Sequence, residues 1–327
     1  MDSARPTSLS LGEFVRALRH APRGTRPALF RTALPLLFRH TQESSGAEFC
    51  EFKSLEEFPA AYSRLAVLLG RPEQAPAAGE IEFLRGLHHR DIHYSGAIGA
   101  TDYFFLIAFA SILAPRHAVE IGTSTGFSSA LIASALHRRH PELAGPLVDT
   151  IDLHSEYLVD RTKPIGFEIP EMLPELPGIV RLHTGRQSDF VRDLAKPNEL
   201  AFVFIDADHQ HPWPLLDLLR VAPYVPGGGW ILLHDIRLGT MGVTAKERDD
   251  SLSYGAPFGA EWLFDRWPFR KINGLNIGAL QLPSNKISIL PTALKLMELP
   301  FEVNPTSPRR MRHELYRAII SLIESTP

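Results

Sequence analysis

The sequence predicts an α/β protein built on a doubly wound, mostly parallel sheet, with a helical N-terminal extension. From about residue 100 onward, short apolar runs alternate with stretches of helical pattern, and this alternation is typical of parallel strands joined by crossover helices. The runs are almost continuously apolar, as strands buried on both faces must be. The first 90 residues instead show helical periodicity only.

The N-terminal extension, residues 1–90, is expected to serve as a lid or an oligomerisation element. Leu11, Phe14, Val15 and Leu18 follow the spacing of an amphipathic helix. Residues 54–57, Ser-Leu-Glu-Glu, form a capping box that predicts a helix running to residue 69, and 81–87 predict a short one. Residues 1–40 hold seven arginines and two acidic residues. A solvated helix face is the favoured interpretation, with a transit peptide or a docking surface for an acidic partner as alternatives.

The α/β domain is expected to span residues 91–285, and a C-terminal extension with a terminal helix to follow over 286–327. The predicted strands are 117–121, 147–151, 179–183, 200–205, 230–234 and 276–282. The predicted helices are 103–114, 128–137, 188–195, 212–222, 260–267 and 308–324.

Composition excludes several classes of protein. The 327 residues carry 34 Lys+Arg against 37 Asp+Glu, a net charge of −3, which gives no reason to expect a nucleic-acid binder. A single cysteine, Cys50, excludes an intrachain disulfide and any cysteine-rich metal site. The longest apolar run, 103–114, is too short to span a membrane. Without a secretory signal, a cytoplasmic location is expected.

The residues that follow the predicted strands carry the chemistry, because ligands of open α/β sheets bind beyond the carboxyl ends of the strands. The first strand leads into Glu120-Ile-Gly-Thr-Ser-Thr-Gly-Phe-Ser128, whose two glycines allow a tight turn close to a ligand. Asp152 follows the second strand, and an acid there can accept hydrogen bonds from a ribose diol. The later strands are followed by Gln187 and Ser188, by Asp206-Ala-Asp-His209, and by His234 with Asp235.

Four of these motifs in this order resemble the class I S-adenosylmethionine-dependent methyltransferases. They are Glu-Ile-Gly-Thr-Ser-Thr-Gly-Phe-Ser, the acid at Asp152, Phe-Ile-Asp-Ala-Asp-His and Pro-Gly-Gly-Gly-Trp-Ile-Leu-Leu-His-Asp. The branch that looks most similar contains the catechol and caffeoyl-CoA O-methyltransferases and related antibiotic-tailoring enzymes. The resemblance covers about residues 95–283 and implies a seven-stranded Rossmann-like sheet.

The resemblance implies S-adenosylmethionine as the cofactor. The loop after the first strand would hold its methionine portion, Glu120 would orient the loop or the cofactor's amino group, Asp152 would bind the ribose, and Gln187 with Ser188 would border the adenine. The full set of expected cofactor-binding residues is Glu120, Gly122, Thr123, Ser124, Gly126, Ser128, Asp152, Gln187, Ser188 and Asp206.

A divalent cation, such as Mg²⁺, is a further expectation at Asp206, His234 and Asp235. Metal-dependent relatives place an Asp-Asn pair where this chain has His234 and Asp235, so the pattern departs from theirs. Two carboxylates and an imidazole can still bind a divalent ion. Alternatively, His209 or His234 is a general base, with Asp206 as the third catalytic candidate. A purely structural role for these side chains is the remaining interpretation.

The expected activity is methyl transfer to an oxygen or nitrogen of a small molecule, in natural-product tailoring for example. Tyr94 and Trp213 are the candidates for the substrate pocket, since an aromatic ring can stack on a planar acceptor. A homodimer is expected, without nucleic-acid or membrane partners. The alternatives are an enzyme that cyclises the cofactor's aminobutyrate chain and releases methylthioadenosine, a hydroxylase-like protein with a redox metal, and a non-catalytic cofactor-binding or interaction protein.

Overall fold

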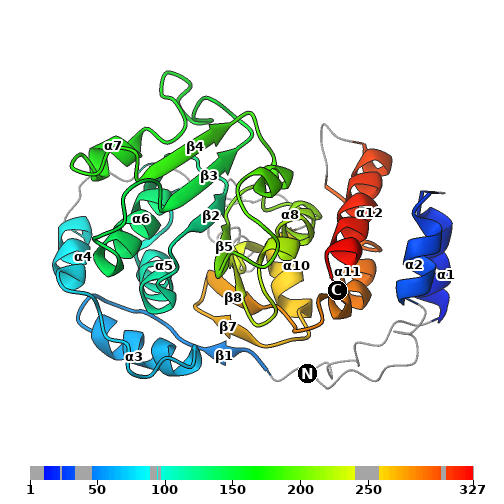
Figure 1. The fold of residues 1–327 in the computed structure, drawn as a ribbon, viewed down its shortest axis with the longest axis horizontal. Helices are drawn as coiled ribbons and strands as arrows, with labels where there is room; N and C mark the ends of the chain where they lie inside the picture. The colour runs from blue at the N-terminus through cyan, green and yellow to red at the C-terminus, as the bar shows by residue number, and fades with distance from the viewer. Residues whose placement is uncertain are drawn as a thin grey trace, which may run out of the picture.

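A single mixed sheet of eight strands forms the centre of the molecule (Figure 1). The computed structural model describes residues 11–22, 24–33, 46–88, 94, 97–239, 258–302 and 307–326. Across the sheet the strands run in the order β1-β7-β8-β6-β5-β2-β3-β4. All neighbouring strands are parallel except where β8 pairs with β6 and with β7. The predicted α/β class is therefore confirmed.

The strands begin and end close to the predicted positions. Their bounds are β1 Glu48–Phe49, β2 Ala118–Ile121, β3 Val148–Asp152, β4 Val180–Thr184, β5 Phe202–Ile205, β6 Trp230–His234, β7 Lys271–Asn273 and β8 Ile277–Gln281. The seven strands that the resemblance implies are one fewer than the eight among the described residues. The six strands predicted from apolar runs lack β1 and β7, which have two and three residues, too few to show an alternating pattern in the sequence.

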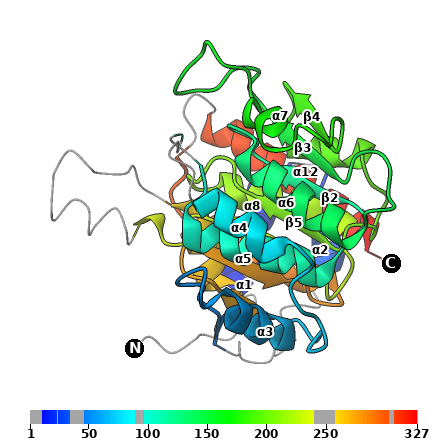
Figure 2. The same ribbon diagram turned by 90° about the vertical axis from the view of Figure 1, so that its left-hand side faces the viewer.

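Helices cover both faces of the sheet, as a doubly wound fold requires. Their bounds are α1 Leu11–His20, α2 Arg26–Ala33, α3 Phe58–Leu68, α4 Glu80–His88, α5 Ala100–Leu113, α6 Phe127–Arg139, α7 Glu168–Met172, α8 Trp213–Val221, α10 Gly259–Arg266, α11 Leu290–Leu296 and α12 Pro308–Ser325. Helices α3 to α6 share one hydrophobic core, whereas α1, α2, α8 and α10 to α12 share the other. Figure 2 shows α3, α4, α5 and α6 together on the side that faces the viewer.

The alternation of strand side chains divides these two cores. Val119 and Ile121 of β2 enter the core of α8 and α12, while Ala118 enters the core of α5 and α6. Both faces are apolar because both are buried, which is why the strands read as continuous apolar runs.

The N-terminal region departs from the all-helical prediction. Strand β1 pairs in parallel with β7, a partner more than 220 residues later in the chain, and Cys50 N donates to Asn273 O at 2.9 Å. The hairpin of α1 and α2 packs instead on the C-terminal helix, where the Tyr316 hydroxyl donates to Ala17 O at 2.9 Å. Residues 188–193 form a 3₁₀ helix in place of the predicted α-helix.

Strand order reverses between β2 and β5, because β3 and β4 follow β2 on one side while β5 and β6 lie on the other. At such a reversal the loops after the two central strands turn to opposite faces, leaving a crevice at the carboxyl edge of the sheet. The residues just after β2, β3 and β5 border this crevice.

Candidate active site

The loop between β2 and α6 is shaped by Gly122. Its φ is +95°, and a Cβ at this position would lie 2.0 Å from the backbone oxygen of Asp206. Only glycine lets the loop after β2 approach the end of β5 this closely. Gly126 has a φ of +88°, and its missing side chain makes room for Gly166 and Ile169. Gly122 thus borders the crevice, whereas Gly126 packs against the α7 region.

Asp152, at the end of β3, holds the same loop in place. Its Oδ2 accepts hydrogen bonds from the Thr123 and Ser124 amides at 3.0 and 3.1 Å, and its Oδ1 accepts one from His154 N at 2.8 Å. A carboxylate has about four acceptor positions, so Oδ1 retains capacity for a further donor. Asp152 also lines the pocket described below.

Glu120 is fully buried beneath the loop. Its Oε2 accepts from the Ser129 hydroxyl and, at 2.7 Å, from the Thr150 hydroxyl, while Oε1 has no partner among the described residues. Ser128 also interacts with the Glu120 carboxyl. Burial raises the pKa of Glu120 to about 7, because water no longer solvates the charged form. The unpartnered oxygen is an acceptor that a cationic group or a water molecule could satisfy.

A pocket of about 390 Å³ occupies the crevice. Its walls come from the loops after β2, β3, β4 and β5 and from the first turns of α8, and most of its lining is apolar. The polar side chains that line it are Ser124, Asp152, His154, Arg186, Gln187, Ser188, Asp206, Asp208, His209, Asp217 and Arg220. A pocket with a largely apolar surface into which polar side chains converge is typical of a small-molecule site.

One end of the pocket is formed by Gln187 and Ser188 together with α8. The Ser188 hydroxyl donates to Asp217, and Arg220 donates to Gln187 Oε1 at 3.1 Å. Burial raises the pKa of Asp217 to about 6. Sequence reasoning missed Asp217, although an acid inside the apolar run Pro-Leu-Leu-Asp-Leu-Leu was a usable signal. Trp213, a substrate-pocket candidate, lines this same pocket one turn earlier on α8.

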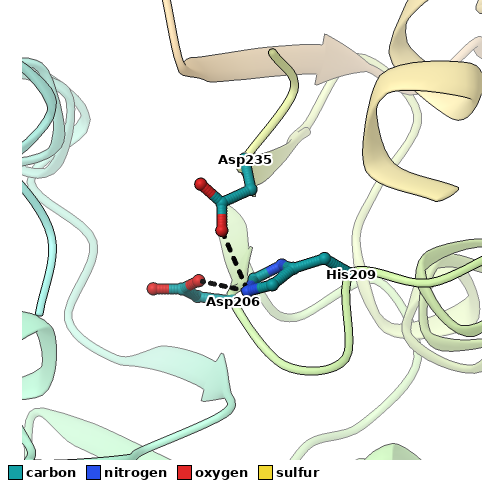
Figure 3. Close-up of side chains that lie close together, drawn as sticks. All are labelled: Asp206, His209 and Asp235. Carbon is teal, nitrogen blue, oxygen red and sulfur yellow. Dashed lines mark ion pairs between the residues drawn. The ribbon is translucent and has the colours of Figure 1, made fainter. Parts of the chain in front are cut away.

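At the other end, Asp206, His209 and Asp235 converge from the ends of β5 and β6 (Figure 3). Their nearest ligand atoms all lie within 4.8 Å of one another. His209 Nε2 lies 2.9 Å from Asp235 Oδ2 and 4.0 Å from Asp206 Oδ1. Asn276 Nδ2 fixes the other Asp235 oxygen at 2.7 Å. Asp235 itself has a φ of +57°, so the chain turns sharply as it leaves β6.

His234 lies behind this group. Its Nδ1 is 3.0 Å from Asp206 Oδ1, and its Nε2 is 3.3 Å from Asp102 Oδ2 in the first turn of α5. Both ring nitrogens are therefore occupied by carboxylates. The sequence predicted Asp206, His234 and Asp235 as metal ligands. In the structure His209, and not His234, completes the group with the two carboxylates. Asp102 was not singled out from the sequence, because nothing local indicates that it meets a residue 132 positions away.

The charges of this group reinforce one another. Burial alone would lower the pKa of His234, but Asp206 and Asp102 raise it well above its ordinary value. Burial would likewise lower the pKa of His209, and its hydrogen bond and charge interaction with Asp235 raise it. Burial would raise the pKa of Asp235, which His209 and His234 instead hold well below its usual range. These interactions thus favour the charged forms of both imidazoles and of Asp235.

Tyr94, the other substrate-pocket candidate, packs beside the start of α7. Its ring packs edge-on against Phe167 at 4.8 Å between centroids, with the Lys163 ammonium 4.0 Å from its own centroid. Tyr94 does not line the pocket. Among the other predicted residues, Glu120, Thr123 and Ser128 lie beneath the loop and do not face the pocket. Thr123 Oγ1 is instead 2.7 Å from Thr150 Oγ1.

Residues 119–236 match a family model described as a methyltransferase domain. The matched segment runs from β2 to the residue after Asp235 and includes all of the strand-end motifs, so the resemblance noted in the sequence is confirmed over that segment. No curated protein sequence matches the chain significantly.

Solved structures with a similar arrangement include several methyltransferases. The O-methyltransferase TomG from Streptomyces achromogenes, solved with S-adenosylmethionine, is 19% identical, with 70% of this chain and 99% of that chain covered and a TM-score of 0.39. An O-methyltransferase from Bacillus cereus, solved with S-adenosylhomocysteine, is 20% identical, covers 70% and 100%, and has a TM-score of 0.39. A putative caffeoyl-CoA O-methyltransferase from Staphylococcus aureus is 13% identical, covers 66% and 96%, and has a TM-score of 0.38.

No helix among the described residues is long and apolar enough to cross a membrane.

Proposed function

We propose that this methyltransferase domain binds S-adenosylmethionine and transfers its methyl group to an oxygen or nitrogen of a small molecule. The observation that carries the proposal is the pocket between Gly122 and Asp217, which lies at the strand-order reversal inside the segment that matches the family model. Its volume of about 390 Å³ is in the range of small-molecule sites.

The residues present fit this cofactor. The remaining acceptor capacity of Asp152, which lines the pocket, suits the ribose hydroxyls. Gln187, Ser188 and Asp217 supply donors and acceptors for a heteroaromatic base at the far end. When bound, S-adenosylmethionine supplies an electrophilic methyl group. The protein's contribution is to position the acceptor atom and exclude water, which recovers about 7–11 kcal/mol of a barrier when orientation is good.

We further propose Asp206, His209 and Asp235 as the residues that would hold a divalent cation. Two carboxylates and one imidazole suit Mg²⁺ or Mn²⁺, with water completing the coordination. Such an ion would take the place of the proton on His209, lower the pKa of a bound hydroxyl and fix its angle. The alternative is proton removal by a side chain alone. The raised pKa of His209 and His234 disfavours that role, because a protonated imidazole is not a base.

Calorimetric titration of the purified protein with S-adenosylhomocysteine tests the cofactor. We expect saturable binding. If no binding is detected up to about millimolar S-adenosylhomocysteine, the affinity is too low for a cofactor product and the proposal is wrong. Incubation with S-adenosylmethionine and candidate acceptors then separates the activities by product. S-adenosylhomocysteine marks methyl transfer, whereas methylthioadenosine marks cyclisation, and binding without turnover marks a non-catalytic protein.

Chelation followed by restoration with single ions tests the cation. We expect Mg²⁺ or Mn²⁺ to restore the methyl-transfer activity of the chelated wild-type protein. The same ions should not restore the activity of the Asp235→Asn variant. Activity that is insensitive to chelation would favour side-chain catalysis instead. A homodimer, a cytoplasmic location and a role in natural-product tailoring stay predictions, and light scattering of the purified protein would check the first of these.

A further inference from the structure

A second pocket lies between the α1–α2 hairpin and the first turns of α12. It shares no lining residue with the pocket at the carboxyl edge of the sheet. The three helices lie side by side at one end of the molecule (Figure 1). The cleft between them has a volume of about 820 Å³. Among the described residues, two histidines and no carboxylate line it, together with five arginines: Arg19, Arg26, Arg309, Arg310 and Arg312. We call this the basic cleft.

Within the part of the chain that the structure describes, three of the basic cleft's arginines are not neutralised by an ion pair. Among the described residues, Arg19, Arg309 and Arg310 have no ion-pair partner within 4.0 Å. Glu314 on α12 and Glu298 after α11 are engaged with other arginines. Glu314 accepts from Arg220 at 3.2 Å and from Arg317 at 3.3 Å, and Glu298 lies 3.7 Å from Arg16. Like charges gathered without counterions repel one another, so the arrangement gains free energy when an anion enters.

Two of the guanidinium groups are held in place by neutral partners. Arg26 donates from Nε to Ala21 O at 3.0 Å and from Nη2 to Arg19 O at 3.1 Å. Arg312 donates from Nη1 to Met297 O at 3.1 Å. Carbonyl oxygens orient an arginine without cancelling its charge, so both groups keep their charge and their remaining N–H donors. Ser307 Oγ accepts from Arg310 N at 3.3 Å and caps α12, so an anion would be bound by side chains rather than by free backbone amides.

From this geometry we propose that the basic cleft is a binding site for a small molecule that carries an oligophosphate chain, such as a nucleoside polyphosphate. Guanidinium groups pair with phosphate oxygens through two parallel hydrogen bonds, and several arginines on two facing walls match several phosphates in a row. A ligand with a single carboxylate would leave most of these guanidinium N–H donors without an acceptor. The concave shape favours a ligand that enters the cleft over a flat anionic surface.

Inorganic triphosphate is the probe, titrated into the full-length protein by calorimetry at low salt. We expect saturable binding that weakens as salt rises. Arg310→Ala, on one wall, and Arg19→Ala, on the other, should each weaken binding by about tenfold, since one charge-assisted hydrogen bond contributes about 1.5 kcal/mol or more. Both side chains are exposed, so neither variant should impair folding.

Arg317→Ala is the matched control. It removes an exposed arginine of the same helix that lies outside the cleft and pairs with Glu314, and it should leave triphosphate affinity within about twofold. Circular dichroism checks the fold of every variant. The absence of triphosphate binding, or equal weakening by Arg317→Ala, would overturn the proposal. So would binding only to phosphatidylglycerol-containing vesicles, because that result would identify the cleft as part of a lipid-facing surface. None of these outcomes depends on the catalytic activity.

Discussion

Replacing Gly122 with alanine is the most direct test of how the sheet edge is built. The residue has a φ of +95°, and its added Cβ would lie 2.0 Å from Asp206 O, 2.5 Å from Asp206 C and 2.8 Å from Ala207 Cα. All three atoms belong to backbone, so no side chain can rotate away. To accept the methyl group, the loop after β2 and the end of β5 must separate.

The cost follows from what such a separation breaks. Gly122 N donates to Ile151 O at 2.8 Å and Asp206 N donates to Ile121 O at 2.8 Å, both at the end of the ladder. Each buried group left without its partner costs about 1–3 kcal/mol, and the positive φ adds about 1–2 kcal/mol for a residue with a Cβ. We therefore expect Gly122→Ala to lower the free energy of unfolding by about 4 kcal/mol. It should also displace Asp206 and weaken S-adenosylhomocysteine binding at least tenfold.

Gly145→Ala provides the control, because Gly145 has a φ of +97° and no atom within 4 Å of its added Cβ. Gly145→Ala should lower the free energy of unfolding only by the cost of a positive φ, about 1–2 kcal/mol, and should retain its affinity for S-adenosylhomocysteine. Urea denaturation and calorimetry measure the two quantities. If both variants lose the same stability and bind S-adenosylhomocysteine equally well, the close approach of β2 and β5 does not shape this site.

Three further changes probe other parts of the structure. Burial raises the pKa of Asp217 in the folded protein to about 6, against an ordinary value of 3.8, so the stability of the wild type falls as pH rises between these values. Asp217→Asn should therefore be more stable than the wild type by up to about 3 kcal/mol above pH 6 and equally stable near pH 4. Urea denaturation at a series of pH values measures this difference. Asp149→Asn should cost about 2 kcal/mol in urea denaturation, since it removes the buried negative charge to which Arg181 donates at 2.5 and 2.9 Å. The rings of His117 and His183 lie 2.7 and 2.6 Å from the same carboxylate and lose that charge as well. Asp206→Ala should abolish turnover while the exposed Asp193→Ala does not, and product formation by Asp206→Ala would exclude a catalytic role.

The sheet's central strands could be predicted from the sequence because burial on both faces leaves an unmistakable apolar run. The same pattern fixes where each strand ends, and therefore which residues reach the crevice. Gly122, Asp152 and Asp206 were found in this way, since each is identified by its position relative to one strand. Their placement at a common edge followed from the parallel arrangement alone.

What the sequence did not predict depends on contacts between distant segments. Strand β1 has two residues and pairs with a strand near the C-terminus, so neither its length nor its pattern marks it. The division of roles between His209 and His234 depends on Asp102, which α5 brings to the end of β6 from the other face of the sheet. A residue's type and spacing indicate that it can titrate or ligate, but only packing decides whether both of its polar atoms are already occupied.

The positions of Asp102 and Asp217 explain how a rigid fold can hold these charged groups. Asp102 belongs to α5, whose apolar side chains fill one core, and Asp217 belongs to α8, which packs in the other. Each helix is fixed by its core and directs one carboxyl toward the carboxyl edge of the sheet. The hydrophobic cores thus offset the cost of burying these acids, and they set the distance between the Asp217 end of the pocket and Asp206. Substitutions within α5 or α8 that shift either helix should therefore change the site without touching a residue that lines it.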